Sequence, residues 1–235
     1  MGLRIAGDEN VAEGNKIGTD LAGATAIGND VGVIIAGGDR NRFSGNVVAG
    51  SSWYGIELTT EYDAPDGNVI ADNEVGVGAD GVTPIPNGGG IDGVDDGIHI
   101  GTGSGTVIEG NVIASNHDDG IELSAAVSET RIVGNRIGTD ATGTRDLGNL
   151  ESGVEIGGDR NAVGDPATAA GRNVISHTAR TGSRSATAGR ATRCCATRSS
   201  STTGSASTSG RTGATSTIRR PTPTAAPTTS RTRRR

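Results

Sequence analysis

The sequence predicts an all-β fold, a right-handed parallel β-helix of about five to six coils over residues 1–176. A strand phrase that begins with Gly recurs along these residues, and a phrase that begins with Asn alternates with it. Large rings are scarce, since Phe43, Trp53, Tyr54 and Tyr62 are all the aromatic residues of the chain. A narrow core of stacked β-branched side chains suits this composition, whereas a β-sandwich core would need more rings.

The first phrase reads Gly, apolar, any residue, apolar. It occurs at Gly2–Ile5, Gly32–Ile35, Gly55–Leu58, Gly97–Ile100, Gly120–Leu123 and Gly153–Ile156. Because side chains alternate along a strand, the two apolar residues face a core and the middle residue faces out. The leading Gly residues lie 30, 23, 42, 23 and 33 positions apart, so a base period of 23 residues carries insertions. That period fits one coil of short strands and turns.

The second phrase reads Asn, any residue, apolar. It occurs at Asn15–Ile17, Asn46–Val48, Asn73–Val75, Asn111–Ile113, Asn135–Ile137 and Asn173–Ile175. Asn at the same place in every coil can form a ladder of hydrogen bonds along the axis. Asn also tolerates the left-handed backbone of a coil corner. Both interpretations predict a β-helix.

The insertions are expected to form loops on one face of the solenoid. Residues 18–29 and 138–149 share the form Gly-Thr-Asp running to Gly-Asn, and the longer stretch from Gly78 to Asp95 resembles an extended relative. Asp20 and Asp140 in this motif can bind a cation, but each loop offers few acids, so a Thr/Asp turn is the simpler interpretation.

Charge divides the chain in two. Residues 1–176 hold all 27 acidic residues and 9 of the 21 basic ones, a balance of 9 − 27 = −18, whereas residues 177–235 carry 12 Arg and no acid. An acidic body excludes nucleic acid as its expected partner. The tail is poor in large aliphatic residues, so we expect disorder there.

The tail composition has a genetic interpretation. GC-rich codons for Asn, Asp, Gly and Ile, read one base late, begin as codons for Thr, Thr, Ala and Ser, the residues that abound in the tail. Residues from about His177 would then be an out-of-frame reading of further coils. The alternative is a basic tail that binds nucleic acid or an acidic surface.

The N-terminal residues open directly on a strand phrase, without the basic and apolar segments of a signal peptide. An open coil exposes its core, so we expect this chain to be part of a longer β-helix protein. No apolar run is long enough for a transmembrane helix. Cys194 and Cys195 are adjacent and have no zinc-ligand spacing.

Residues 1–176 resemble the parallel β-helix repeat proteins of the pectate-lyase-like superfamily, in particular large secreted bacterial proteins with the Gly-Thr-Asp…Gly-Asn insertion. The resemblance implies an extracellular or cell-surface location. Members include lyases, hydrolases, epimerases and adhesins, so the fold by itself assigns no activity.

One outward strip carries the candidate site. The middle residues of the Gly phrase are Arg4, Ile34, Glu57, His99, Glu122 and Glu155, and they should stack in one column. The candidate catalytic residues are Glu57, Asp96, His99 and Glu122; the candidate sugar-stacking residues are Trp53 and Tyr54; the candidate Ca²⁺ ligands are Asp95, Asp96, Asp118 and Asp119. Carboxylates on neighbouring coils approach the spacing of glycosidases, and clustered carboxylates suit Ca²⁺.

Other features favour a non-catalytic role. Asp95-Asp96-Gly97-Ile98 is similar to the paired-aspartate motif of polygalacturonase-type hydrolases, but the companion Asn-Thr-Asp, Gly-His-Gly and Arg-Ile-Lys motifs are absent, and the phrase repeats at Asp118–Ile121. No Lys or Arg lies between Arg42 and Arg131 to assist a lyase. Polar side chains also occur on any solvent-facing strand. We therefore expect a non-catalytic surface module that contacts polysaccharide, with no required cofactor; the alternative is a polysaccharide hydrolase, lyase or epimerase.

Overall fold

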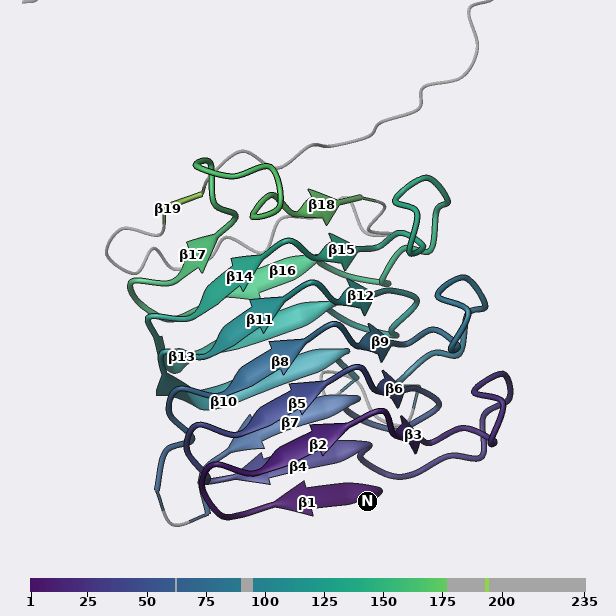
Figure 1. The fold of residues 1–235 in the computed structure, drawn as a ribbon, viewed down its shortest axis with the longest axis horizontal. Helices are drawn as coiled ribbons and strands as arrows, with labels where there is room; N and C mark the ends of the chain where they lie inside the picture. Colours follow the sequence, from purple (N-terminus) through teal and green to yellow (C-terminus); the bar gives the residue numbers. More distant parts are fainter. Residues whose placement is uncertain (62, 90–94, 177–192, 195–235) are drawn as a thin grey trace, which may run out of the picture. The chain divides into compact units, whose positions relative to one another are not determined.

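The computed structural model describes residues 1–61, 63–89, 95–176 and 193–194, and in them the chain winds through six coils of three parallel strands (Figure 1). Sheet A contains β1 (Leu3–Ile5), β4 (Val33–Ala36), β7 (Ile56–Thr59), β10 (Ile98–Ser104), β13 (Ile121–Ser128) and β16 (Val154–Ile156). Sheet B contains β2 (Val11–Glu13), β5 (Arg42–Ser44), β8 (Val69–Ala71), β11 (Val107–Glu109), β14 (Arg131–Val133), β17 (Ala162–Val163) and β19 (Arg193–Cys194). Sheet C contains β3 (Lys16–Ile17), β6 (Val47–Val48), β9 (Glu74–Val75), β12 (Val112–Ile113), β15 (Arg136–Ile137) and β18 (Val174–Ile175). The predicted all-β solenoid is confirmed.

The core is a single apolar column inside the three sheets. Each strand contributes one or two inward residues, and the equivalent residues of successive coils stack in register, as in the Ile98–Ile121 and Ile108–Ile132 pairs. Phe43 is the one aromatic ring in this core among the described residues, and it stacks on Ile70. The narrow interior filled by Ile, Val and Leu therefore matches the composition.

The leading Gly of the first phrase is required by close contact between coils at five of its six positions, Gly2, Gly32, Gly55, Gly97 and Gly120. A Cβ atom on Gly97 would lie 2.8 Å from the carbonyl oxygen of Gly120 and 2.6 Å from Nδ2 of Asn116. The same conflict recurs along the column, since a Cβ on Gly120 would lie 2.6 Å from the carbonyl oxygen of Gly153. Backbone stacks directly on backbone here, which leaves no space for a side chain.

The Asn residues of the second phrase form a continuous buried ladder. The Asn111 Oδ1 atom accepts hydrogen bonds from the backbone N–H and the side-chain amide of Asn73, both at 2.9 Å. Asn111 in turn donates from both groups to Asn135 Oδ1 at 2.9 Å. The same bonds link Asn15, Asn46, Asn73, Asn111, Asn135 and Asn173.

The interpretation of these Asn residues as left-handed corner residues is wrong. The left-handed position is the one before the Asn: φ is +63° at Gly45, +55° at Asp72 and +69° at Gly110, while the Asn residues of the ladder do not have positive φ. The backbone reverses at the preceding residue because the Asn side chain must turn inward to reach the next coil.

The insertions form three loops that follow β3, β9 and β15 on one side of the helix (Figure 1). Each is closed by an antiparallel bridge, Thr19 to Ala26, Val77 to Pro84 and Thr139 to Asp146. The loops contact one another across the intervening coil: Ala79 N–H donates to Gly23 O at 2.9 Å, and Ala141 N–H donates to Gly81 O at 3.0 Å. The middle loop is therefore a true relative of the other two.

The acids of these loops cap turns. Asp20 Oδ1 accepts the backbone N–H groups of Ala24 and Thr25, and Asp140 Oδ1 accepts those of Thr144 and Arg145. These contacts support the interpretation of Gly-Thr-Asp as a turn motif.

Two tail residues, Arg193–Cys194, form β19 and pair with β17 in sheet B. The remainder of the predicted disordered segment 177–235 lies outside the described residues. Within the part of the chain that the structure describes, no helix is long and apolar enough to cross a membrane.

Candidate functional site on sheet A

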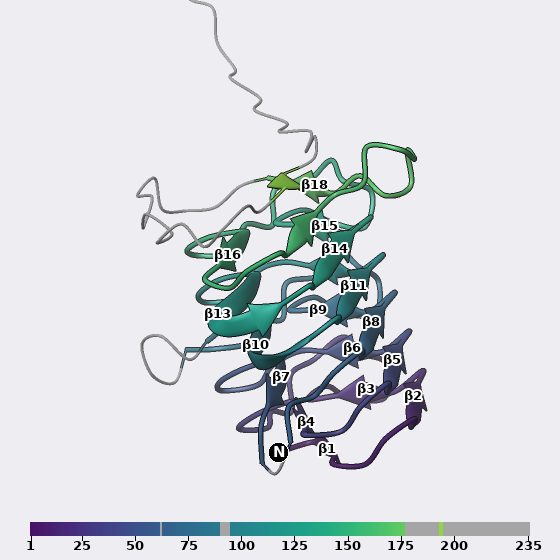
Figure 2. The same ribbon diagram turned by 90° about the vertical axis from the view of Figure 1, so that its left-hand side faces the viewer.

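The outward column of sheet A has the predicted composition. The strand register aligns Arg4 with Ile34, Ile34 with Glu57, Glu57 with His99, His99 with Glu122, and Glu122 with Glu155. In Figure 2, β7, β10, β13 and β16 lie one above another and carry this column. His99 therefore lies between two carboxylates on adjacent coils, because the parallel register places equivalent residues side by side.

His99 makes the most specific contacts of the column. Its ring stacks on Tyr54, with centroids 4.6 Å apart and planes 12° from parallel. Its Nε2 atom lies 3.2 Å from Ser124 Oγ and 3.8 Å from Glu122 Oε2. Burial lowers the pKa of His99, and the Glu122 charge opposes this shift.

Ser124 is absent from the candidate residues that the sequence suggested. It lies two residues beyond Glu122 on β13, in a position that the regular alternation of strand side chains would treat as ordinary surface. The signal that locates Ser124 is the contact with His99, which joins the two strands diagonally just before a register shift between β10 and β13. Composition and spacing carry no trace of this shift.

Asp96 is the buried acid of the site, with 1% of its surface exposed. Its Oδ1 atom accepts the Asp119 backbone N–H at 3.0 Å, while Oδ2 has no well-formed hydrogen bond among the described residues. Burial first, and then the nearby Glu122 carboxylate, raise the pKa of Asp96 to about 9. Asp96 is therefore a neutral acid near pH 7.

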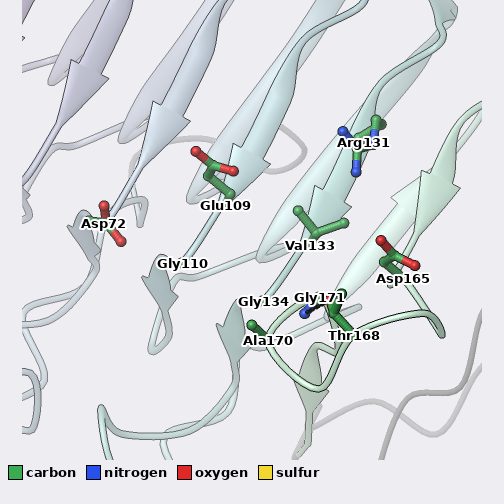
Figure 3. A pocket seen from close by; sticks show the side chains of 10 residues that line it. All are labelled: Asp72, Glu109, Gly110, Arg131, Val133, Gly134, Asp165, Thr168, Ala170 and Gly171. Carbon is green, nitrogen blue, oxygen red and sulfur yellow. Dashed lines mark hydrogen bonds between the residues drawn. The ribbon is translucent and has the colours of Figure 1, made fainter.

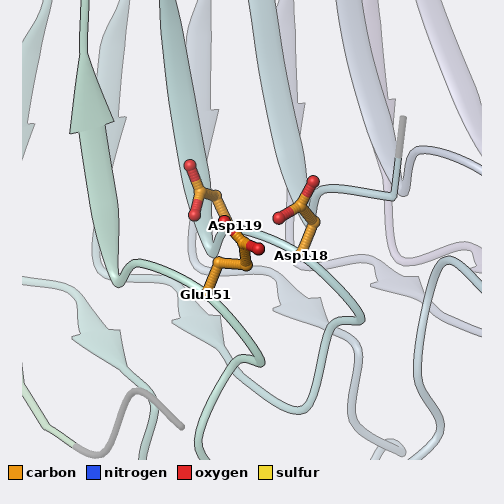
Figure 4. A group of neighbouring side chains, drawn as sticks. All are labelled: Asp118, Asp119 and Glu151. Carbon is orange, nitrogen blue, oxygen red and sulfur yellow. The ribbon is translucent and has the colours of Figure 1, made fainter. Parts of the chain in front are cut away.

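Asp118 and Asp119 meet a third acid, Glu151, at the corner before the sheet A strands (Figure 4). Carboxylate oxygens of the three lie within 4.8 Å of one another. Burial is the main cause that raises the pKa of Asp119 to about 7 and that of Asp118 to about 6. A cation at this corner would relieve the repulsion.

The four predicted Ca²⁺ ligands are not one cluster. Asp95 and Asp96 lie outside the group formed by Asp118, Asp119 and Glu151. Asp95 is buried, and its Oδ2 atom accepts the Gly89 N–H at 2.9 Å. Glu151 was not predicted as a ligand, although it stands two residues before Gly153 as Asp118 does before Gly120.

Glu57 and the two aromatic residues complete the strip. Glu57 is half-buried, and burial raises its pKa. Burial and the surrounding carboxylates, first Asp96, raise the pKa of Tyr54 to about 12, so its hydroxyl remains protonated. Trp53 is 40% exposed, whereas Tyr54 is partly covered by the His99 ring.

A separate groove of about 330 Å³ lies on the sheet B side (Figure 3). Glu109 and Arg131 come from β11 and β14, and the loop after β17 supplies Asp165 and Thr168 to its wall. No sequence motif indicated this groove. Its charged side chains come from neighbouring coils, and its wall is a loop of irregular length.

Fold and site together define a parallel β-helix with a polar, partly buried outer face on sheet A. The model of the right-handed beta helix region matches residues 2–163, and the chain belongs to this family. No curated protein gives a significant match to the chain. No solved structure does so either.

Proposed function

We propose that the chain is a secreted or cell-surface β-helix module whose sheet A face binds polysaccharide. The observation that carries the proposal is the exposed Trp53 side chain, three residues before β7, together with the polar column formed by Glu57, His99 and Glu122. The resemblance to pectate-lyase-like repeat proteins supports the same class of ligand.

The arrangement suits a hydroxyl-rich polymer. Aromatic faces such as that of Trp53 offer flat apolar contact area with little conformational entropy to lose. Half-buried Glu57 and Glu122 present carboxylate acceptors that bond strongly to hydroxyl donors. Because equivalent positions recur at each coil, roughly 4.8 Å apart, a linear chain can contact successive coils in the same way.

Binding of neutral and uronic-acid polysaccharides by isothermal titration calorimetry tests this proposal. Trp53→Ala should weaken binding by at least about tenfold, since the contact of one aromatic anchor contributes on the order of 1–2 kcal/mol. Leu21→Ala removes another exposed apolar side chain, 94% exposed in the first loop, and should bind as the unaltered chain does. Equal affinities for all three proteins, or no binding by any, would contradict the proposal.

A second candidate function is hydrolysis of a glycosidic bond, favoured by the Asp96–Glu122 pair. Asp96 retains a proton to a pKa of about 9, and the nearby Glu122 side chain is one of the causes of that shift. A protonated carboxyl group close to a second carboxyl group is the arrangement that acid–base hydrolysis of glycosides uses.

Reducing-sugar release from the same polysaccharides tests this second function. Asp96→Asn and Glu122→Gln should each abolish turnover if it occurs, while Glu109→Gln on the outer face of sheet B should not. Turnover that survives in Asp96→Asn would remove this pair from the mechanism.

A further inference from the structure

We propose that Ser124 and His99 form a nucleophile–base pair that hydrolyses esters, with O-acylated polysaccharide as the substrate class. The pair is assigned from the 3.2 Å contact between Ser124 Oγ and His99 Nε2. This activity goes beyond the proposed function, which requires only that the sheet A face bind a glycan.

The first support is a β-bulge that positions Ser124. Ile100 pairs with Leu123 and Thr102 pairs with Ala126, so Gly101 on β10 faces two residues on β13, Ser124 and Ala125. A bulge bends its strand and redirects a side chain, and bulges are frequent next to active sites. Ser124 lies at the start of this bulge, two residues after Glu122, the residue that pairs with His99, and its hydroxyl contacts the His99 ring on the neighbouring strand.

The second support is the way in which His99 is held. Tyr54 stacks on one face of the ring, and only 15% of the His99 side chain is exposed. The Nδ1 atom is buried and has no hydrogen-bond partner among the described residues, so the polar contacts of the ring are all made through Nε2. Burial lowers the pKa of His99, which keeps the ring neutral and able to accept a proton near pH 7.

Glu122 provides the charge that the reaction needs. Its Oε2 atom lies 3.8 Å from His99 Nε2, close enough to stabilise the imidazolium ion that forms when His99 accepts a proton. Glu122 thus acts on His99 rather than on the ester, and is a positioning residue in this reaction. The arrangement differs from a hydrolase triad, in which the acid contacts the other ring nitrogen.

The proposed reaction balances without any further reagent. Ser124 Oγ attacks the ester carbonyl carbon while its proton passes to His99 Nε2, and the tetrahedral intermediate then expels the sugar alkoxide, which takes that proton from His99. Water attacks the acyl-serine with His99 as base, and the carboxylic acid leaves as the proton returns to Ser124. The sum is ester and water to alcohol and acid.

Labelling with a fluorophosphonate probe, mapped by mass spectrometry, tests the pair in the full chain. The probe should modify the peptide that contains Ser124, and Ser124→Ala or His99→Gln should reduce labelling there by about 100-fold or more, the usual contribution of a general base. Ser128→Ala changes another serine of β13 and should label as the unaltered chain does. Acetate release from acetylated xylan and acetylated pectin should follow the same order of variants.

Two outcomes would overturn the proposal: labelling at Ser124 no greater than in heat-denatured chain, or labelling that persists unchanged in His99→Gln. If His99→Gln lowers the melting temperature, its loss of labelling could come from loss of the fold. The labelling of Ser124→Ala compared with that of Ser128→Ala then tests the proposal by itself. Glycan binding by Ser124→Ala separates the two proposals, because loss of the nucleophile should remove ester hydrolysis and leave polysaccharide affinity unchanged.

Discussion

Single buried amides hold the coils of this β-helix together. Each interior Asn of the ladder accepts the backbone N–H of the Asn in the previous coil and donates its own backbone N–H to the Asn of the next coil. The Asn side chains therefore supply the hydrogen-bond acceptors for the backbone N–H groups at the corner. Asn111 also donates to the Ile70 carbonyl at 2.9 Å, which ties the ladder to the strand behind it. A buried polar group without a hydrogen bond lowers the free energy of unfolding. A residue that lacks the Asn amide would leave such groups at the corner, so the ladder restricts this position to Asn.

Asn111→Ala is expected to lower the free energy of unfolding by more than about 2 kcal/mol, because it leaves the buried backbone N–H of Asn73 and one of its two side-chain N–H groups without an acceptor, the other being bonded to the Phe43 carbonyl. Urea denaturation followed by circular dichroism measures the change. The matched control is Asn15→Ala at the exposed end of the same ladder, where the loss should be smaller. If both variants lose the same free energy of unfolding, the burial of an Asn in the ladder does not determine how much it stabilises the chain.

Asp96 accepts the Asp119 N–H with a carboxyl group where the ladder uses an amide. In the folded chain its pKa is raised to about 9 from an ordinary value of 3.8. Between these values the folded state holds a proton that the unfolded state has released, so stability must fall as pH rises. Asp119, with a pKa of about 7, acts in the same direction.

The melting temperature should therefore fall by at least about 3 °C between pH 6.5 and pH 9, since 1 kcal/mol corresponds to roughly 2–4 °C in a domain of this size. Asp96→Asn keeps the acceptor for Asp119 N–H and has no titrating proton, so its melting temperature should vary less over this range. Thermal melts at several pH values measure both proteins. If the melting temperature of Asp96→Asn varies with pH as much as that of the unaltered chain, groups other than Asp96 cause the pH dependence.

At the scale of elements, the Gly phrase predicted each sheet A strand and the residues that face out. Alternation sufficed because every coil repeats one geometry, and so the neighbours of His99 in the column, Glu57 and Glu122, could be predicted. The β10–β13 bulge could not be predicted, because a bulge arises from a mismatch between two strands rather than from either one. Ser124 was missed because its contact with His99 runs diagonally between two strands, and Glu151 was missed as a ligand although it aligns with Asp118 before the leading Gly.

Gly97→Ala should destabilise the chain by about 1–3 kcal/mol, the usual effect of forcing an atom into a packed contact, because the new Cβ would meet the Gly120 carbonyl. Gly7→Ala is the control, since a Cβ there would lie 3.5 Å from Asn10 Nδ2, an ordinary contact. Urea denaturation compares the two variants. A Gly97→Ala variant as stable as the Gly7→Ala variant would mean that the coils can separate locally without loss.

At the scale of the whole β-helix, the strands of each coil pair with those of the adjacent coils, and the insertion loops contact one another across one intervening coil. Coil one, formed by β1 to β3, has one neighbouring coil among the described residues, whereas the fourth coil, β10 to β12, has two. Residues of β2 are correspondingly more exposed than those of β11. Stability in such a solenoid is a sum of coil and interface contributions, so it must vary along the axis.

Hydrogen exchange should follow this gradient in the 235-residue chain. Amides of residues 1–17 should exchange faster than those of residues 98–123, because opening the first coil breaks one interface and opening a central coil breaks two. Exchange measured by mass spectrometry at peptide level gives the comparison. Uniform protection along residues 1–176 would instead indicate a single cooperative unit.

The loops repeat at a longer interval than the strands, because among the described residues the first, third and fifth coils carry them and each loop contacts the next across a coil without one. The unit that can be gained or lost without changing the spacing of the loops is therefore a pair of coils, one with a loop and one without. Gain or loss of such a pair keeps every loop two coils from its neighbour. Gain or loss of a single coil would bring two loops together or separate them, so lengthened or shortened versions of this molecule should differ by even numbers of coils.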